Sequence, residues 1–231
     1  MVKFLARVFF APLARLVFRP KIVGKRNVPK QGGVLLASNH LSFVDSIVIT
    51  LVAPRSVAFL AKSEYFTGRG LRGWLSRSFF TGIGAVPVVR GAGQAAQDAL
   101  ATGQHILDRG GAFAIYPEGT RSLDGRIYRG RTGVAWLALE SRVPVVPVAL
   151  TDTQKLLPLG SRRPRLHRVT VQFGEPITLS GDAKSGRARR SGTDEIMAAI
   201  QRMSGQEIAD GYNEPPAATL RERVRRAFRR R

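Results

Sequence analysis

The sequence predicts an α/β fold with a mixed, largely parallel sheet flanked by helices. Short apolar runs typical of buried strands alternate along the chain with segments of helical periodicity. At 231 residues and 44% hydrophobic content, the chain can bury the core of one domain with short terminal extensions. Because strands alternate with helices, we expect successive strands to be joined by helical crossovers and therefore to lie mostly parallel.

The N-terminal segment over residues 1–20 is predicted to be an amphipathic helix that lies on a membrane surface. On a helical wheel one arc is apolar and the opposite arc is basic, with the cations Lys3, Arg7, Arg15 and Arg19. Apolar side chains would lie among acyl chains and the cations among phosphates, with Pro12 kinking or dividing the helix. A helix packed on its own domain has the same pattern and is the alternative. No apolar run approaches the roughly 20 residues of a spanning helix.

The elements that follow are expected to form one domain over residues 21–178. The predicted strands cover 34–38, 56–61, 84–89, 112–117, 143–150 and 167–173, and the predicted helices lie near 43–52, 69–78, 93–108 and 131–141. Residues 179–231 are predicted to hold a polar linker, a helix near 193–206 and a basic tail ending in three arginines. The tail either contacts anionic headgroups or nucleic-acid phosphates, or is simply solvated.

The charge balance predicts a polyanionic partner. Lys and Arg outnumber Asp and Glu 37 to 16, which gives a net charge of +21. The positive electrostatic field of such a chain attracts an anionic membrane surface or nucleic acid. A non-enzymatic protein that binds polyanions is therefore one interpretation. The sequence has no RNP1 motif or zinc-finger spacing, so no nucleic acid is expected. The lack of cysteine excludes disulfides and thiolate chemistry, and it is compatible with the cytoplasmic face of the cell membrane.

The first candidate motif is ASNHLSFVD at 37–45, where a predicted strand runs into a helix. Ser42 and Asp45 match a capping box, in which Ser42 caps the helix and Asp45 occupies its first turn. In the functional interpretation, the Asp45 carboxylate orients the imidazole of His40, which can then remove a hydroxyl proton near neutral pH. The two interpretations are compatible, because the cap would position the pair.

The second candidate motif is AIYPEGTRS at 114–122, where an apolar strand runs into a Pro-Glu-Gly-Thr turn. Such a turn can present backbone N–H groups to an anion, and Arg121 adds bidentate donors suited to phosphate. An ordinary turn at the end of a strand is the alternative. The other histidines have a weaker case as catalytic residues, because His105 lies inside the predicted helix at 93–108 and His167 begins the predicted strand at 167–173. No His/Asp/Glu cluster has metal-ligand spacing, so neither a metal nor a bound cofactor is expected.

With both motifs in place, the chain resembles the glycerolipid acyltransferases, and lysophosphatidic acid acyltransferases in particular. NHLSFVD resembles their His-x4-Asp motif and YPEGTRS their Glu-Gly-Thr-Arg motif. GAVPVVRG, which contains Arg90, and VPVVPVAL are similar to the second and fourth family motifs, in the family's order. AKSEYF and RGRTGVAWLALES extend the likeness over about residues 20–175. The chain departs from many members at Val88 and Val89, where they carry an aromatic or Ile-Asp sequence.

The resemblance implies that a fatty acyl group moves from an acyl thioester, on coenzyme A or acyl carrier protein, to the 2-hydroxyl of 1-acyl-sn-glycerol 3-phosphate. The product would be phosphatidic acid, made in phospholipid biosynthesis by a peripheral membrane enzyme. The resemblance also allows a different acceptor, either glycerol 3-phosphate or another lysophospholipid. His40 and Asp45 would be catalytic. The implied substrate-binding residues are Lys62, Arg90, Glu118, Gly119, Thr120 and Arg121.

Overall fold

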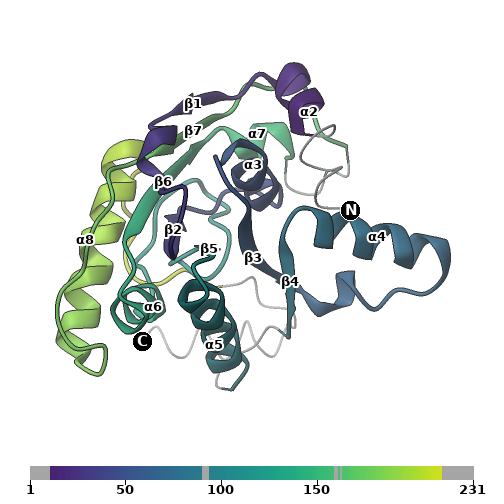
Figure 1. The fold of residues 1–231 in the computed structure, drawn as a ribbon. Helices are drawn as coiled ribbons and strands as arrows, with labels where there is room; N and C mark the ends of the chain where they lie inside the picture. The colour runs from purple at the N-terminus through teal and green to yellow at the C-terminus, as the bar shows by residue number, and fades with distance from the viewer. Residues whose placement is uncertain (1–10, 90–93, 159–160, 162, 215–231) are drawn as a thin grey trace, which may run out of the picture.

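The computed structural model describes residues 11–89, 94–158, 161 and 163–214, and a seven-stranded sheet forms its centre (Figure 1). The strands are β1 (Lys21–Val23), β2 (Val34–Ser38), β3 (Val57–Lys62), β4 (Ala85–Val88), β5 (Ala112–Ile115), β6 (Val145–Thr151) and β7 (Thr170–Phe173). Their order is β1-β7-β6-β2-β5-β3-β4. All neighbours are parallel except β6 and β7, so the predicted mixed, largely parallel sheet is confirmed.

Helices cover both faces of this sheet (Figure 1). They are α2 (Ala11–Phe18), α3 (Asp45–Val52), α4 (Gly70–Gly82), α5 (Gln94–Asp108), α6 (Gly133–Ser141), α7 (Thr153–Leu156) and α8 (Gly186–Ser204), with 3₁₀ turns η2 (Lys25–Asn27) and η3 (Ser63–Tyr65). Successive side chains of a strand point to opposite faces. Leu36 of β2 therefore packs with α3 on one face, whereas Leu35 packs with α5, α6 and α8 on the other. The central strand is buried on both sides, as its unbroken apolar sequence predicts.

The predicted elements agree with the observed ones to within a few residues, with three differences among the strands and helices. The short helix α7 was not predicted. Strand β1 was not expected, because its three residues carry too little pattern to predict a strand. Helix α8 starts at Gly186, inside the segment predicted as a polar linker, so that linker is shorter than expected. The side chain of Ser185 caps the helix by accepting the N–H of Ala188 at 3.2 Å. Ile196 and Ile200 are fully buried, so α8 belongs to the same core.

The predicted N-terminal helix lies partly outside the described residues, which begin at Ala11. The described part, α2, carries Pro12 in its first turn, where proline is tolerated. It packs on the domain, because the guanidinium of Arg15 donates to the carbonyl of Leu51 and Phe18 contacts the core. The basic tail beyond residue 214 also lies outside the described residues. Within the described ranges, no helix is both long and apolar enough to cross a bilayer.

Candidate active site

The candidate site lies at the carboxyl ends of the neighbouring parallel strands β6, β2 and β5. The loop after β2 carries NHLSFVD, the loop after β5 carries YPEGTRS, and the chain after β6 enters α7. Because the three strands are parallel, the loops that follow them lie side by side at the carboxyl edge of the sheet, where α/β proteins bind ligands. Asn39 ties the first loop to β6. Its side-chain amide donates to the carbonyl of Leu150 at 2.9 Å and accepts the N–H of Leu150 at 2.8 Å.

His40 and Asp45 are in direct contact. The imidazole Nδ1 of His40 lies 2.8 Å from Oδ2 of Asp45, whose side chain is fully buried at the start of α3. The same oxygen accepts the backbone N–H of Leu41 at 2.7 Å and that of Ser42 at 2.8 Å. These donors and the positive end of the helix dipole stabilise the carboxylate. A carboxylate accepts hydrogen bonds, so Nδ1 carries the hydrogen and Nε2 is left to accept a proton.

The capping-box interpretation of Ser42 is wrong. Helix α3 has Val44 at its N-cap, without a side-chain capping bond. The hydroxyl of Ser42 instead donates to the carbonyl of Leu157 at 3.2 Å. Asp45 accepts the loop N–H groups in its place, as the hydrogen bonds to Oδ2 show. The carboxylate therefore both shapes the loop and holds the histidine.

The imidazole is held on its face as well as at its edge. The rings of His40 and Tyr116 stack with centroids 3.9 Å apart and planes 12° apart. The hydroxyl of Tyr116 lies 2.7 Å from the hydroxyl of Ser46 on α3. The His40 side chain keeps 14% of its surface exposed, so a substrate can reach the ring. Sequence reasoning assigned no role to Tyr116. Its position at the end of β5, the strand beside β2, was the signal available.

Glu118 is fully buried and bridges two loops. It accepts the backbone N–H of His40 at 3.3 Å through one oxygen and that of Tyr128 at 3.1 Å through the other. Burial raises the pKa of the Glu118 carboxyl from 4.5 to about 7, although both backbone hydrogen bonds oppose the rise. Glu118 thus fixes the backbone beneath the histidine.

Replacing Glu118 with glutamine should destabilise the fold by about 1–3 kcal/mol, because an amide can accept only one of the two N–H groups. The destabilisation should also depend on pH. The folded-state pKa is raised, so the proton-linked stability of wild type is fully present below about pH 4.5 and is lost as the pH rises through about 7. The difference in melting temperature between wild type and Glu118→Gln, measured from pH 4.5 to 7.5, should therefore shrink with rising pH. A constant difference would contradict the buried, proton-binding carboxyl.

Two backbone N–H groups in and just after the Glu-Gly-Thr turn donate to the protein itself, although the turn was predicted to present N–H groups to an anion. The N–H of Gly119 donates to the carbonyl of Tyr116 at 2.9 Å, and that of Ser122 donates to the carbonyl of His40 at 2.7 Å. Gly119 has φ +78°, a left-handed conformation that favours glycine over residues with a Cβ. The carbonyl of Thr120 accepts from the side chain of Asn213 at 3.3 Å. The turn therefore links the two motifs rather than offering these N–H groups to an anion.

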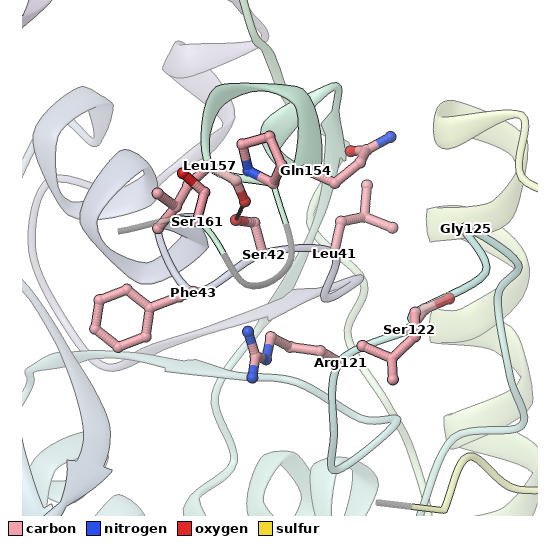
Figure 2. Close-up of a pocket in the computed structure, with 11 residues that line it drawn as sticks. Leu41, Ser42, Phe43, Arg121, Ser122, Gly125, Gln154, Leu157 and Ser161 are labelled. Carbon is pink, nitrogen blue, oxygen red and sulfur yellow. Dashed lines mark hydrogen bonds between the residues drawn. The ribbon is translucent and has the colours of Figure 1, made fainter. Parts of the chain in front are cut away.

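A pocket of about 400 Å³ opens beside these loops (Figure 2). It is lined by Leu41, Ser42, Phe43, Arg121, Ser122, Leu123, Gly125, Gln154, Leu157, Pro158 and Ser161. Figure 2 shows the guanidinium of Arg121 extending towards Phe43, beneath Ser42. Apolar walls together with the cation of Arg121 suit an amphiphile that carries an anionic group. The wall after β6 was not predicted, because the sequence around Gln154 carries no motif.

The other predicted binding residues are placed differently. Lys62 is exposed at the end of β3 and is not part of the pocket lining, and Arg90 lies outside the described residues. Glu118 lies buried behind the lining. A second histidine–aspartate contact, from His167 to Asp152, is longer at 3.6 Å and more exposed. In the part of the chain that is described, no three His, Asp or Glu side chains are grouped to hold a metal ion.

Comparisons with known proteins identify the family of the chain. Residues 19–151 match the family model described as Acyltransferase. A chloroplastic 1-acyl-sn-glycerol-3-phosphate acyltransferase of Brassica napus is 31% identical over 68% of this chain and 44% of its own length. One of Arabidopsis thaliana is 31% identical over 75% of this chain and 48% of its own length. The chain thus spans about half the length of these relatives. The crystal structure of the 1-acyl-sn-glycerophosphate acyltransferase PlsC of Thermotoga maritima superposes with a TM-score of 0.63 at 25% identity, over 88% of this chain and 77% of that one.

Proposed function

The chain belongs to the acyltransferase family, and on that premise we propose that it transfers a fatty acyl group from an acyl thioester to the 2-hydroxyl of 1-acyl-sn-glycerol 3-phosphate. The donor is coenzyme A or acyl carrier protein carrying the acyl group, and the product is phosphatidic acid. The observation that carries the proposal is the 2.8 Å contact between His40 and Asp45 next to a pocket that contains Arg121. The relatives in Brassica and Arabidopsis carry the name of this activity.

In the proposed reaction, Nε2 of His40 accepts the proton of the acceptor hydroxyl as its oxygen attacks the thioester carbonyl. Asp45 accepts the hydrogen bond from Nδ1 and offsets the positive charge that develops on the ring. The new C–O bond forms, the C–S bond breaks, and the imidazolium returns the proton to the thiolate. The substrate alcohol stands where a hydrolase has its serine, so no covalent acyl-enzyme is expected. An acyl-enzyme trapped in a quench experiment would contradict this route.

Arg121 is the proposed ligand of the acceptor phosphate, because its guanidinium lies in the pocket and suits a bidentate contact. Leu41, Phe43 and Leu157 offer apolar surface for the acyl chain. Gly119 and Thr120 shape the turn that holds Arg121. Lys62 and Arg90 are retained as candidates for the phosphate, on the strength of the family resemblance. We also propose peripheral association with the cytoplasmic face of the membrane, since the net charge of +21 suits a leaflet rich in anionic lipids.

Replacing Arg121 with alanine should raise the KM for the lysophospholipid by about 10–100-fold, because a pair of charge-assisted hydrogen bonds to phosphate is lost. Arg121→Lys should recover part of this loss, since it restores the charge without the bidentate geometry. Arg126→Ala is the matched control. Arg126 pairs with Asp124 at 2.8 Å and does not line the pocket, so its KM should stay near that of wild type. An unchanged KM in Arg121→Ala would exclude the phosphate role.

The proposed activity is tested with purified full-length protein, labelled acyl-coenzyme A or acyl carrier protein, and a panel of acceptors. The panel contains lysophosphatidic acid, glycerol 3-phosphate and lysophospholipids with other headgroups. Phosphatidic acid made from lysophosphatidic acid, and lost in His40→Ala, is the expected result. A different preferred acceptor would change the substrate but not the reaction. A protein that binds polyanions equally well with and without His40, and forms no ester, would be a basic binding protein instead.

A further inference from the structure

Helix α4 presents an apolar face to solvent. Among its 13 residues Gly73 is the one that is buried, whereas Leu71, Trp74, Leu75 and Phe79 are 39–72% exposed. These four side chains stand at i, i+3, i+4 and i+8, so they share one side of the helix. Figure 1 shows α4 beside β4 at the edge of the sheet, extending away from the body of the domain. Contiguous exposed apolar surface of this kind marks a site of interaction.

The opposite side of α4 is attached to the domain. A Cβ on Gly73 would lie 2.0 Å from the carbonyl oxygen of Gly68, so the two backbone segments are in close contact. The hydroxyl of Ser76 donates to the carbonyl of Tyr65 at 2.7 Å. Phe80 stacks on Tyr65 with ring centroids 4.5 Å apart. The helix is therefore already packed on its inner side, and its outer apolar face is additional to that packing.

The charges around this outer face are basic. Arg69, Arg72 and Arg77 are exposed on the same segment, and α4 itself contains no acidic residue. Arg72 and Arg77 stand at the two margins of the apolar arc when 3.6 residues make a turn. A helix with large apolar side chains on one side and arginines at its margins is suited to the headgroup layer of an anionic bilayer. Charge complementarity thus favours a phospholipid surface over an uncharged protein partner.

An aromatic path connects α4 with the pocket. The ring of Phe80 lies 5.4 Å from that of Phe79 on the outer face. Phe43 meets Tyr65 edge to face at 6.0 Å and Phe80 at 6.5 Å. Phe43 lies between His40 and Asp45 in sequence and lines the pocket. The outer face of α4 is therefore continuous, through these rings, with the candidate active site.

We propose that the outer face of α4 inserts into the headgroup region of an anionic phospholipid bilayer and holds the pocket mouth at Phe43 against the lipid. The surface is formed by α4, which was not among the segments predicted to bind a membrane. The proposal of insertion is supported by the exposed apolar side chains of α4 and by the arginines beside them. The consequence that a lipid acceptor enters past Phe43 rests on the proposed function.

The experiment uses tryptophan fluorescence, because the chain contains two tryptophans, Trp74 and Trp136. In the full-length Trp136→Phe protein, Trp74 is the single reporter. On mixing with vesicles of equimolar phosphatidylglycerol and phosphatidylcholine, its emission should shift to the blue and be quenched by brominated acyl chains. Trp74→Phe, which retains Trp136 beside the core, should show neither change. If Trp136→Phe does not fold, the difference between wild type and Trp74→Phe gives the same answer.

Three results would overturn the proposal. The first is binding to vesicles while the Trp74 spectrum stays unchanged, since another segment would then make the contact. The second is absence of vesicle binding. The third is a Trp74 shift that depends on protein concentration and not on vesicles, because a second copy of the chain would then cover the face.

A variant series separates this surface from catalysis. Leu71→Ser/Trp74→Ser/Leu75→Ser should lower vesicle affinity by about tenfold or more, since each side chain loses apolar burial in the interface. Ile208→Ser removes an equally exposed apolar side chain elsewhere and should change nothing. Binding is measured without acyl donor, so its outcome is independent of the proposed reaction. With donor present, the triple variant should lose activity towards a long-chain acceptor in vesicles but retain it towards a short-chain, monomeric acceptor.

Discussion

Replacing His40 with alanine should lower kcat/KM for acyl transfer by about 10²–10⁴-fold, the range typical of a lost general base. Nε2 of His40 is the proposed proton acceptor, and the ring is held by Asp45 at 2.8 Å and by the face of Tyr116 at 3.9 Å. Alanine removes the base, but the backbone bonds from His40 to Glu118 and Ser122 remain available. Initial rates with labelled acyl-coenzyme A, alongside a melting curve, measure the two effects separately.

His167→Ala is the matched control for His40→Ala. His167 also lies near an aspartate, Asp152, but at 3.6 Å and with a more exposed side chain, and it does not line the pocket. Its removal should leave kcat/KM within about twofold of wild type, as expected of a surface substitution. Equal losses in the two variants, or full activity in His40→Ala, would refute the assignment of His40 as the base.

Asp45→Asn should lower kcat by about 10³–10⁴-fold and also destabilise the protein by about 1–3 kcal/mol. Three donors converge on Oδ2 of Asp45, from His40, Leu41 and Ser42. The other oxygen, Oδ1, is buried and has no hydrogen-bond partner among the described residues. An asparagine must place its NH₂ group either against these donors or in that position. The imidazole also loses the negative charge that stabilises its protonated form.

Rates and melting temperatures of Asp45→Asn and of three comparison variants separate its effect on catalysis from its effect on stability. Asp152→Asn alters the more exposed aspartate beside His167 and should match wild type in rate. The double variant His40→Ala/Asp45→Asn should be no slower than His40→Ala alone, because residues that act as a unit give non-additive losses. Multiplied losses in the double variant would show that Asp45 acts independently of His40.

The sequence pattern predicts some elements of the fold, whereas others depend on long-range contacts. Strands β2 and β6 carry unbroken apolar runs, which predict buried strands wherever they lie in the sheet. Strand β1 has three residues and exists because it pairs with β7, from Lys21 against Thr170 to Val23 against Gln172. Helix α8 begins among polar residues, and its position depends on burial of Ile196 against distant elements. Contacts between residues that are far apart in the sequence therefore determine the existence of β1 and the position of α8.

The sequence by itself predicted the alternation of strands and helices, and the resemblance of NHLSFVD to a family motif predicted that His40 and Asp45 act together. A separation of five residues permits their contact without imposing it, and the backbone N–H groups that bind Oδ2 of Asp45 shape the loop that brings the two side chains together. Only the tertiary structure decided that Glu118 and Tyr116 meet His40, and that Arg121 and Leu157 line one pocket. Those contacts require β2 to lie between β5 and β6, an order set by packing of the whole sheet. Tertiary packing also determined which side of α4 is covered, since both sides carry large apolar residues.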